Sequence, residues 1–530
     1  MFSRSNLFRC LTAAFFTLTL AMTAAAQSAE LAALANQAKA AMAAERFDEA
    51  AASYREILKT LPDEPGIMMN LGMALSMAGK PQEAVQPLAR ALELRPTLIN
   101  AALFLGQSHL DLGQPEQAID PLQKFVAAQP ANVQARQMLA SASLMAGRHQ
   151  QAAAEFRKVT QQAPADAKGW YGLVQSYDAL SQETLDTLAK TAGAAPYEPL
   201  LMADALESEG KFEQAFAFYK ESLKELPNLR ATHESLARIY TKTGHADWAA
   251  QTTAKARQLA PACAEAATAA TAKPAGAGAS AKAAVSAKTG KSAECEFRAK
   301  RYLDAIAAVA KNEDAEALYW KTRAYAELAS GALAKLAAMK PSLELHELRA
   351  ELYRNQRRHL QSVKELKAAL TFAPNDPRLQ RELAKSYYFS RDWENARTLF
   401  EELLKAAGRN ADPELQYFYG DVLLQSQQAE AALPYLKAAV DGAPDMPPAH
   451  ATYGRALVQL GRFAEAIPHL ETVLNEDEDG SLHYQLARAY QGTGQVEKAK
   501  PLLEKYQQLQ RNSQPAANSG SPPAITPPGA

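Results

Sequence analysis

The segment RFDEAAASYREIL, residues 46–58, is the most informative part of the sequence for the fold, because close variants of it recur at a fixed interval. KPQEAVQPLARAL begins 34 residues later at Lys80, and QPEQAIDPLQKFV and RHQQAAAEFRKVT follow at Gln114 and Arg148. An alanine keeps its place in all four stretches, and a proline follows each alanine twelve residues later. The two series are Ala50, Ala84, Ala118 and Ala152, and Pro62, Pro96, Pro130 and Pro164. Such a period is typical of a repeat architecture.

Each unit of this period contains two runs in which apolar residues recur at helical spacing. A glycine separates the two runs, at Gly79, Gly113 and Gly147. The proline ends the second run, because proline cannot continue a helix. Small residues at fixed places, such as Gly72 and Ala84, allow the two helices to approach closely. The sequence therefore predicts one helix–turn–helix hairpin per unit and an all-α fold.

The unit resembles the tetratricopeptide repeat (TPR), whose motif carries Trp, Leu-Gly, Tyr, Ala, Phe, Ala and Pro at fixed offsets. The matching residues are Trp170, Leu173 and Tyr177 in one first helix, the pairs Leu71-Gly72 and Leu105-Gly106, and the second-helix aromatics Tyr54, Phe156 and Tyr219. The resemblance covers residues 31–510. It implies an α-solenoid of stacked TPR-like hairpins.

The repeat register continues through most of the chain and gives about a dozen units. The later places of the repeat alanine are Ala215, Ala249, Ser362, Ala396, Ala432, Ala466 and Ala499. A degraded unit surrounds Asp186, where the expected second helix has lost this alanine. Trp320 marks a further first helix whose partner is shortened.

Composition divides the repeats into two predicted arrays, residues 27–261 and 296–510. Between them, residues 262–295 contain 15 alanines among 34 residues and a single large apolar side chain, Val285. This segment buries too little surface to offset its ordering entropy, so we expect a flexible linker. Residues 511–530, which end in SPPAITPPGA, are expected to form a disordered proline-rich tail.

Residues 1–26 have the pattern of a secretory signal peptide. Arg4 and Arg9 precede an apolar run from Leu11 to Met22, and small residues lead to a cleavage site after Ala26. The apolar run is short for a membrane span. We therefore expect a periplasmic or secreted protein that has no integral membrane span after cleavage.

Two cysteines, Cys263 and Cys295, remain after the predicted cleavage. An oxidising compartment favours a disulfide between them, and two free thiols are the alternative. Neither cysteine has a histidine nearby in sequence, which argues against a catalytic thiol.

Charge and motifs exclude several classes of function. The chain has 57 Lys+Arg against 58 Asp+Glu, a formal net charge of −1, whereas nucleic-acid binders rely on an excess of basic residues. We therefore predict no nucleic-acid partner. The sequence contains no GxSxG, GxxxxGK[ST], HExxH or CxxC motif, so we predict neither an enzyme nor a bound cofactor. An enzyme whose chemistry is dispersed in the loops is a minor alternative.

Three histidines in the last units, His450, His469 and His483, and the acidic run NEDEDG at residues 475–480 are candidate metal ligands. The acidic run lacks the glutamate that closes a calcium loop, because Leu486 holds that place. Histidines scattered over helices more often serve packing or the surface. We predict no metal site.

The TPR resemblance implies that the first helices of the hairpins line a concave face, where such proteins bind extended peptides or partner helices. In the N-terminal array the predicted partner-binding residues are Met69, Met73, Met77, Gln107, Gln137 and Ser141. In the C-terminal array they are Arg381, Lys385, Tyr388, Tyr417, Asp421, Arg455, Tyr484 and Arg488. The alternatives are that several methionines belong to the core between repeats, and that the Arg and Tyr residues lie on a solvated face.

The domain layout resembles that of exported bacterial TPR proteins, and this resemblance implies a non-catalytic scaffold in the bacterial envelope that binds peptides or partner proteins on concave TPR surfaces. An adaptor for polysaccharide export, or a carbohydrate-binding protein, is the alternative. The sequence leaves the oligomeric state open.

Overall fold

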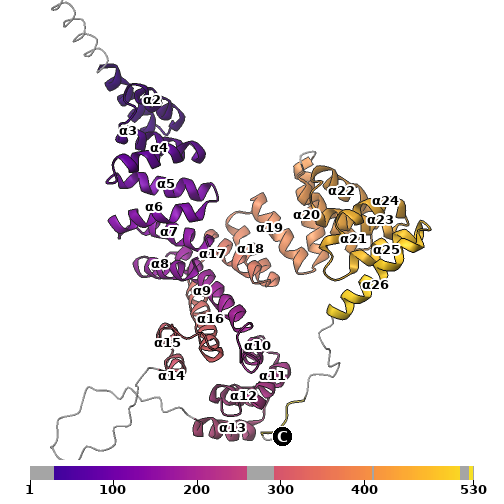
Figure 1. Cartoon of the computed structure of the whole chain (residues 1–530). Coiled ribbons are helices and arrows are strands. Elements are labelled where there is room, and N and C mark those ends of the chain that lie inside the picture. Colours follow the sequence, from indigo (N-terminus) through magenta and orange to yellow (C-terminus); the bar gives the residue numbers. More distant parts are fainter. Residues whose placement is uncertain (1–28, 260–291, 409–410, 514–523, 529–530) are drawn as a thin grey trace, which may run out of the picture. The chain divides into compact units, whose positions relative to one another are not determined.

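The computed structural model describes residues 29–259, 292–408, 411–513 and 524–528. Every regular element among these residues is a helix, and consecutive helices pair as hairpins (Figure 1). Residues 29–43, ahead of the first labelled helix, are also helical. The prediction of an all-helical solenoid of TPR-like hairpins is therefore confirmed.

The described helices form two compact units, and each unit draws helices from both predicted arrays. The first unit contains α2 (Phe47–Thr60), α3 (Pro65–Met77), α4 (Pro81–Leu94), α5 (Ile99–Asp111), α6 (Pro115–Ala128), α7 (Val133–Met145), α8 (His149–Gln162), α9 (Ala167–Leu188), α14 (Ala293–Arg298), α15 (Tyr302–Ala308) and α16 (Ala315–Ala337).

The second unit contains α10 (Glu198–Ser208), α11 (Phe212–Glu225), α12 (Arg230–Lys242), α13 (Ala246–Gln258), α17 (Leu343–Asn355), α18 (His359–Phe372), α19 (Pro377–Phe389), α20 (Trp393–Ala407), α21 (Pro413–Gln425), α22 (Ala429–Gly442), α23 (Pro447–Gln459), α24 (Phe463–Thr472), the 3₁₀ turn η2 (Leu474–Glu476), α25 (Ser481–Gly492) and α26 (Val496–Ser513).

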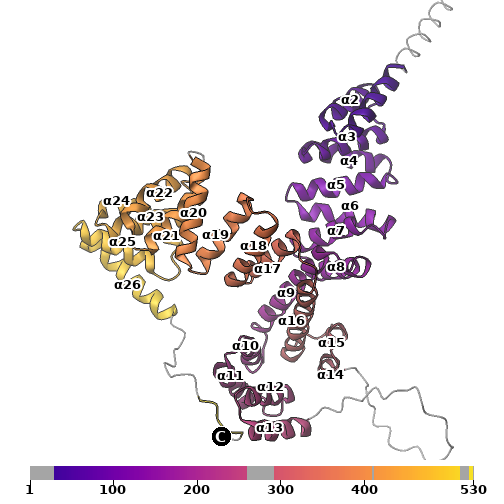
Figure 2. The ribbon, with the colours of Figure 1, turned by 180° about the vertical axis from the view of Figure 1, so that it is seen from behind.

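Helices α9 and α16 are longer than the other repeat helices and pack along each other (Figure 1 and Figure 2). The hydroxyl of Ser181 donates to the carbonyl of Thr322 at 3.2 Å, and the Thr322 hydroxyl donates to that of Thr184 at 2.9 Å. The rings of Tyr177 and Tyr325 stack with their centroids 6.3 Å apart. This pairing joins two parts of the chain that lie about 140 residues apart.

The degraded unit expected around Asp186 is not a separate hairpin. Asp186 lies in the last turns of α9, which continues without interruption to Leu188. The reason is local, because residues 178–188 contain no glycine or proline that would break the helix. Trp320 does lie in a helix, as expected. This helix, α16, is long and begins at Ala315.

Glycine turns and capping side chains determine where the helices of the regular hairpins end and begin. Gly79, Gly113 and Gly147 follow first helices with φ of 71°, 66° and 71°, a conformation that glycine adopts without a steric penalty. At the starts of some first helices, such as α7 and α21, side chains accept hydrogen bonds from backbone N–H groups of the first turn. Asn132 accepts from the N–H of Ala135 at 2.9 Å, and Asp412 accepts from that of Leu415 at 2.8 Å.

Small residues allow the two helices of a hairpin to touch. A Cβ atom added to Gly72 would lie 2.3 Å from Cγ of Leu88, and one added to Gly106 would lie 2.5 Å from Cγ of Leu122. Real Cβ atoms do not approach other atoms so closely. The repeated glycine is therefore required by the packing of α3 on α4 and of α5 on α6.

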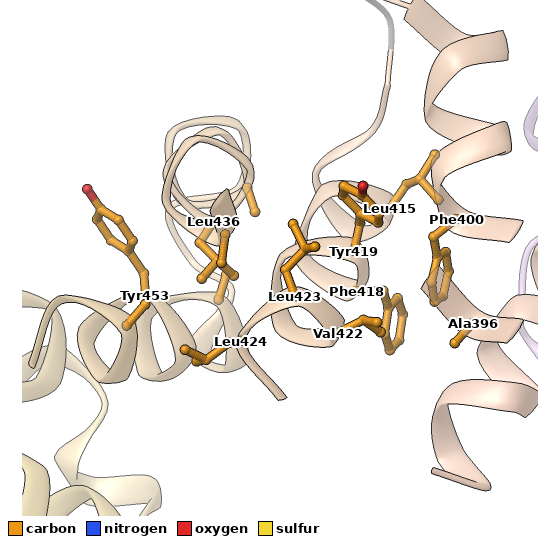
Figure 3. Close-up of a cluster of buried hydrophobic side chains, with 14 of the residues drawn as sticks. Ala396, Phe400, Leu415, Phe418, Tyr419, Val422, Leu423, Leu424, Leu436 and Tyr453 are labelled. Atoms are coloured by element: carbon orange, nitrogen blue, oxygen red, sulfur yellow. The ribbon is translucent and has the colours of Figure 1, made fainter. Parts of the chain in front are cut away.

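The same arrangement builds the core of the second unit. Figure 3 shows Phe400 of α20 facing Phe418 of α21, and their rings are stacked 5.6 Å apart with an interplanar angle of 2°. Leu436 of α22 is fully buried and fills the space beside Gly420. Each hairpin thus contributes large side chains to a core that continues from one repeat to the next.

Two of the other sequence predictions concern residues that are partly described. Cys295 lies in α14 and is disulfide-bonded, but Cys10 and Cys263 lie outside the described residues, as does the signal peptide. The Cys263–Cys295 pairing therefore stays a prediction. The predicted linker is described from residue 292 onward, and α14 begins at the next residue, Ala293. None of the described helices is long and apolar enough to cross a membrane.

The first testable prediction concerns the glycine contacts. Gly106→Ala should lower the free energy of unfolding by about 1–3 kcal/mol, because the buried Leu122 side chain must move. Gly331→Ala is the matched control in α16 of the same unit, where no atom lies within 4 Å of an added Cβ. This control should stabilise the protein by about 0.5–1 kcal/mol, since alanine favours a helix. Urea unfolding followed by circular dichroism measures both. Equal midpoints for the two variants would contradict the packing.

Candidate functional site

The predicted N-terminal residues lie on α3, α5 and α7, which are first helices that contact one another in order. Met69, Met73, Gln107, Gln137 and Ser141 are partly buried. Met69 packs against the buried core of α2 to α5, as the alternative interpretation of the methionines requires. Met77, in contrast, is 47% exposed at the end of α3.

The two glutamines of this face are engaged within the protein. Gln107 donates to a carboxylate oxygen of Asp111 at 2.6 Å, and Gln137 donates to the carboxylate of Asp166. Their amide groups therefore have partners before any ligand arrives. This leaves Met77 as the most exposed of the predicted residues on the N-terminal face.

Six of the eight predicted C-terminal residues are brought together by α19, α21 and α23, which contact one another as successive first helices. We call this group, with the two acidic residues that join it, the polar cluster. Its members are Arg381, Lys385, Tyr388, Asp412, Glu414, Tyr417, Asp421 and Arg455.

Ion pairs link α19 to the start of α21. The guanidinium of Arg381 binds Asp412 with both Nη atoms, at 2.5 and 2.7 Å, and Glu414 at 2.8 Å. Lys385 Nζ donates to Glu414 at 2.9 Å and lies 5.6 Å from the centre of the Phe418 ring. A bidentate contact of this kind fixes geometry as well as charge. Asp412 also caps α21, so a single carboxylate begins one helix and holds the preceding first helix.

Asp421 is the centre of the polar cluster and is 2% exposed. Its carboxylate accepts from the Tyr388 hydroxyl at 2.5 Å, from Arg455 Nη2 at 3.1 Å and from the Gln425 amide at 3.2 Å. Three donors from three first-helix positions compensate its loss of water. The buried Nε of Arg455 has no hydrogen-bond partner among the described residues.

Burial sets the protonation of the two tyrosines in the polar cluster. It raises the pKa of Tyr388 well above the ordinary tyrosine value, with further contributions from Tyr417 and Asp421. Burial and the Asp421 charge likewise raise the pKa of Tyr417. Burial alone would also raise the pKa of Asp412, but hydrogen bonds from Arg381 and from the Leu415 N–H lower it overall. The phenols therefore remain hydrogen-bond donors near neutral pH, while Asp412 remains ionised.

The charges of the polar cluster cancel. Its three basic side chains, Arg381, Lys385 and Arg455, face the three carboxylates of Asp412, Glu414 and Asp421. Such a group offers little net charge to a ligand, and the Tyr388 hydroxyl is already bound to Asp421.

Tyr484 and Arg488 lie apart from the polar cluster on α25, the next first helix. Tyr484 is 40% exposed, and its ring lies 5.2 Å from that of Tyr506. Arg488 is exposed and makes no ion pair with any described residue. Because α25 contacts α23, these two side chains extend the first-helix face beyond Arg455.

The three candidate histidines do not converge on one point. Nδ1 of His450 lies 3.0 Å from Nδ1 of His469, whereas His483 pairs with Asp477 at 2.5 Å. Burial and the neighbouring His450 lower the pKa of His469, which favours its neutral form. Within the described parts of the chain, no group of three His, Cys, Asp or Glu side chains has the arrangement of a metal site.

Sequence reasoning missed a pocket of about 590 Å³ in the first unit, between α8, α9, α15 and α16. Tyr177 and Tyr325 line it together with the apolar side chains of Leu303 and Ile306. Arg157 also lines it and makes no ion pair with a described residue. Its volume is in the range of small-ligand sites. No local motif could reveal this pocket, because its walls come from residues 150–187 and 303–325.

A second prediction tests the polar cluster. Asp421→Ala should cost about 2–3 kcal/mol of unfolding free energy, because Tyr388 and Arg455 lose a buried charged acceptor. Tyr388→Phe, which removes one hydroxyl, should cost about 1 kcal/mol. The control is Arg462→Ala, whose solvent-exposed pair with Glu465 should contribute little to the unfolding free energy. Denaturant unfolding ranks the three variants, and an Asp421→Ala variant as stable as the control would refute the arrangement.

Comparisons with known proteins find the tetratricopeptide repeat in several parts of this chain. Models of the tetratricopeptide repeat match residues 35–99, 105–167 and 381–447, residues 423–484, and residues 480–513. No curated protein sequence matched significantly.

Among solved structures, this chain is similar to a MamA protein (19% identity, 37% of this chain and 91% of that chain, TM-score 0.28). It is also similar to residues 41 to the end of MamA from Desulfovibrio magneticus RS-1 (23% identity, 34% and 100%, TM-score 0.29). A third similar structure is YrrB, described as a TPR protein with an unusual peptide-binding site (22% identity, 32% and 88%, TM-score 0.28). Each match covers about a third of this chain.

Proposed function

Because this chain is a tetratricopeptide-repeat protein, we propose that it is a non-catalytic scaffold that binds peptides or partner proteins on the first-helix face of α19 to α25. The observation that supports the proposal is the composition of this face. It presents the partly buried Tyr388 and Tyr417 of the polar cluster on the same face as the exposed Tyr484 and Arg488 of α25. Tyr and Arg are the residues that most often dominate binding energy at protein interfaces.

The charge balance of the polar cluster defines the kind of ligand. A strongly acidic or basic peptide would have to displace the existing ion pairs of Arg381 and Lys385, which costs binding energy. An extended segment without net charge can instead accept a hydrogen bond from the exposed Tyr484 hydroxyl through a backbone carbonyl. Arg488 can then pair with a single carboxylate at one end of the segment, because it is exposed and has no ion-pair partner among the described residues.

A third prediction tests this face directly. Peptides selected from a displayed random library against the protein should bind at least about tenfold more weakly to the double variant Tyr484→Ala plus Arg488→Ala, since each residue is worth about 1 kcal/mol or more at an interface. Fluorescence anisotropy with labelled peptides gives the affinities. Both residues are exposed, so helical circular dichroism should not change.

The matched control for this experiment is Lys437→Ala on α22, a second helix of the same unit. Lys437 is exposed and pairs with Asp441 at 2.6 Å, so its loss removes a surface charge without affecting the first-helix face. Equal affinity of parent, control and double variant would refute binding at α25.

Export is the second part of the proposal. The support is the signal-peptide pattern, with Arg4 and Arg9 ahead of the apolar run and a small-residue site at Ala26. The intact mass of protein from a periplasmic extract should match a chain that begins at Gln27. A mass that retains residues 1–26 would refute export by cleavage. This result would leave the binding proposal untouched, because the two measurements are independent.

A further inference from the structure

A short segment near the end of the chain rests on helix α12, far from it in sequence. The hydroxyl of Tyr240 donates a hydrogen bond of 2.8 Å to the carbonyl oxygen of Thr526. Both residues belong to the second unit. Ile525 and Thr526 are partly buried, and Tyr240 is 1% exposed. Part of the tail that the sequence predicts to be disordered is therefore in contact with the repeats.

The hydroxyl of Tyr240 projects from a group of rings that we call the aromatic cluster. This cluster consists of Phe216, Tyr240, His245 and Trp248. Trp248 stacks on His245 with centroids 4.2 Å apart, and it meets the Tyr240 ring edge-on at 5.7 Å. Phe216 lies 5.9 Å from Tyr240 on another side. Rings held on several sides fix the position of the hydroxyl, so the donor is in place before a carbonyl arrives.

The sequence of the segment suits it to such a donor. Thr526 precedes Pro527, and Pro527 precedes Pro528, so both residues are restricted to extended backbone. The prolines have no N–H group and cannot satisfy nearby carbonyls through a helix. The Thr526 carbonyl therefore depends on an external donor, and a segment that is already extended loses little entropy when it binds.

The position of this contact in the repeat stack is a further reason to expect a bound segment there. Helix α13 is the last of the four-helix run α10 to α13, and the next helix among the described residues, α14, belongs to the first unit. In a solenoid, each hairpin is normally covered by its successor, and an uncovered end has to be shielded. The half-buried Trp248 and His245 are aromatic groups at this end of the stack.

We propose that the aromatic cluster of α11 to α13 is a binding site for an extended, proline-flanked peptide, and that residues 524–528 of the same chain are its resident occupant. This site is distinct from the face of α19 to α25 and does not depend on the function proposed there. A partner that carries a similar segment binds by displacing the resident one. The occupied site therefore has a built-in competitor at the high effective concentration of a tethered peptide.

The experiment compares the full-length chain with a chain that ends at Pro523. The probe is a fluorescein-labelled peptide of residues 521–530, SPPAITPPGA, followed by anisotropy. The truncated chain should bind the probe, and the full-length chain should bind it at least about tenfold more weakly because its own segment competes. Absence of binding to the truncated chain, or equal affinity for both chains, would overturn the proposal.

Two substitutions in the truncated chain test the assigned contact. Tyr240→Phe keeps the ring and removes the donor, so the affinity for the probe should fall by roughly three- to tenfold. The matched control is Tyr219→Phe in α11 of the same four-helix run, whose hydroxyl bonds internally to Asp204 and Glu207. This control should bind the probe as the truncated parent does. An unchanged affinity after Tyr240→Phe would refute the contact.

Two further measurements test the ligand class and the source of the occupant. A probe in which glycines replace Pro527 and Pro528 should bind several-fold more weakly, and equal binding would refute proline-flanked recognition. Light scattering should show the same oligomeric state for the full-length and truncated chains. A dimer that disappears on truncation would overturn the intramolecular assignment, because the segment would then come from a second copy.

Discussion

The packing of α16 along α9 is the interaction on which the first unit depends. Helices α14 and α15 contact α16 and each other, so α16 connects this short group to the repeats of α2 to α9. The contact combines the stacked Tyr177 and Tyr325 with two hydrogen bonds, from Thr322 to Thr184 and from Ser181 to Thr322. Closing a loop of about 140 residues costs entropy, but this cost grows only with the logarithm of loop length. A long, continuous helix pair can therefore supply enough buried surface to hold the two parts of the chain together.

The sequence predicts the regular hairpins well because their determinants are local. The glycine that allows Leu122 to approach Gly106, and the turn glycine at Gly113, both lie within one unit and return in the next. The α9–α16 pair was beyond prediction because its partners are distant in the chain. The sequence did contain a signal, since the register fails around Asp186 and the partner of the Trp320 helix is short. Those two irregular units are the ones that pack on each other.

The candidate site shows the same division between local and distant determinants. The repeat period places Tyr388 and Asp421 on neighbouring first helices, and the structure brings them into contact. The period does not predict the ion pair between Arg381 and Asp412. Asp412 is the N-cap residue of the next first helix, and from the sequence alone only this capping role is expected. The contact between Thr526 and Tyr240 and the pocket between α8, α9, α15 and α16 also depend on the tertiary fold. Composition alone therefore predicts a proline-rich tail, but not its contact with α12.

The hydrogen bond between the chain's last described segment and α12 also bears on how the second unit comes apart. Stacked repeats unfold from their ends, where each hairpin has one neighbour instead of two. In this unit residues 524–528 contact α12, next to α13, the last helix of the α10 to α13 run. Release of Thr526 uncovers the Tyr240 hydroxyl and frees residues 524–528 in the same step. Local opening at this end of the run therefore exposes two parts of the chain to proteases at once.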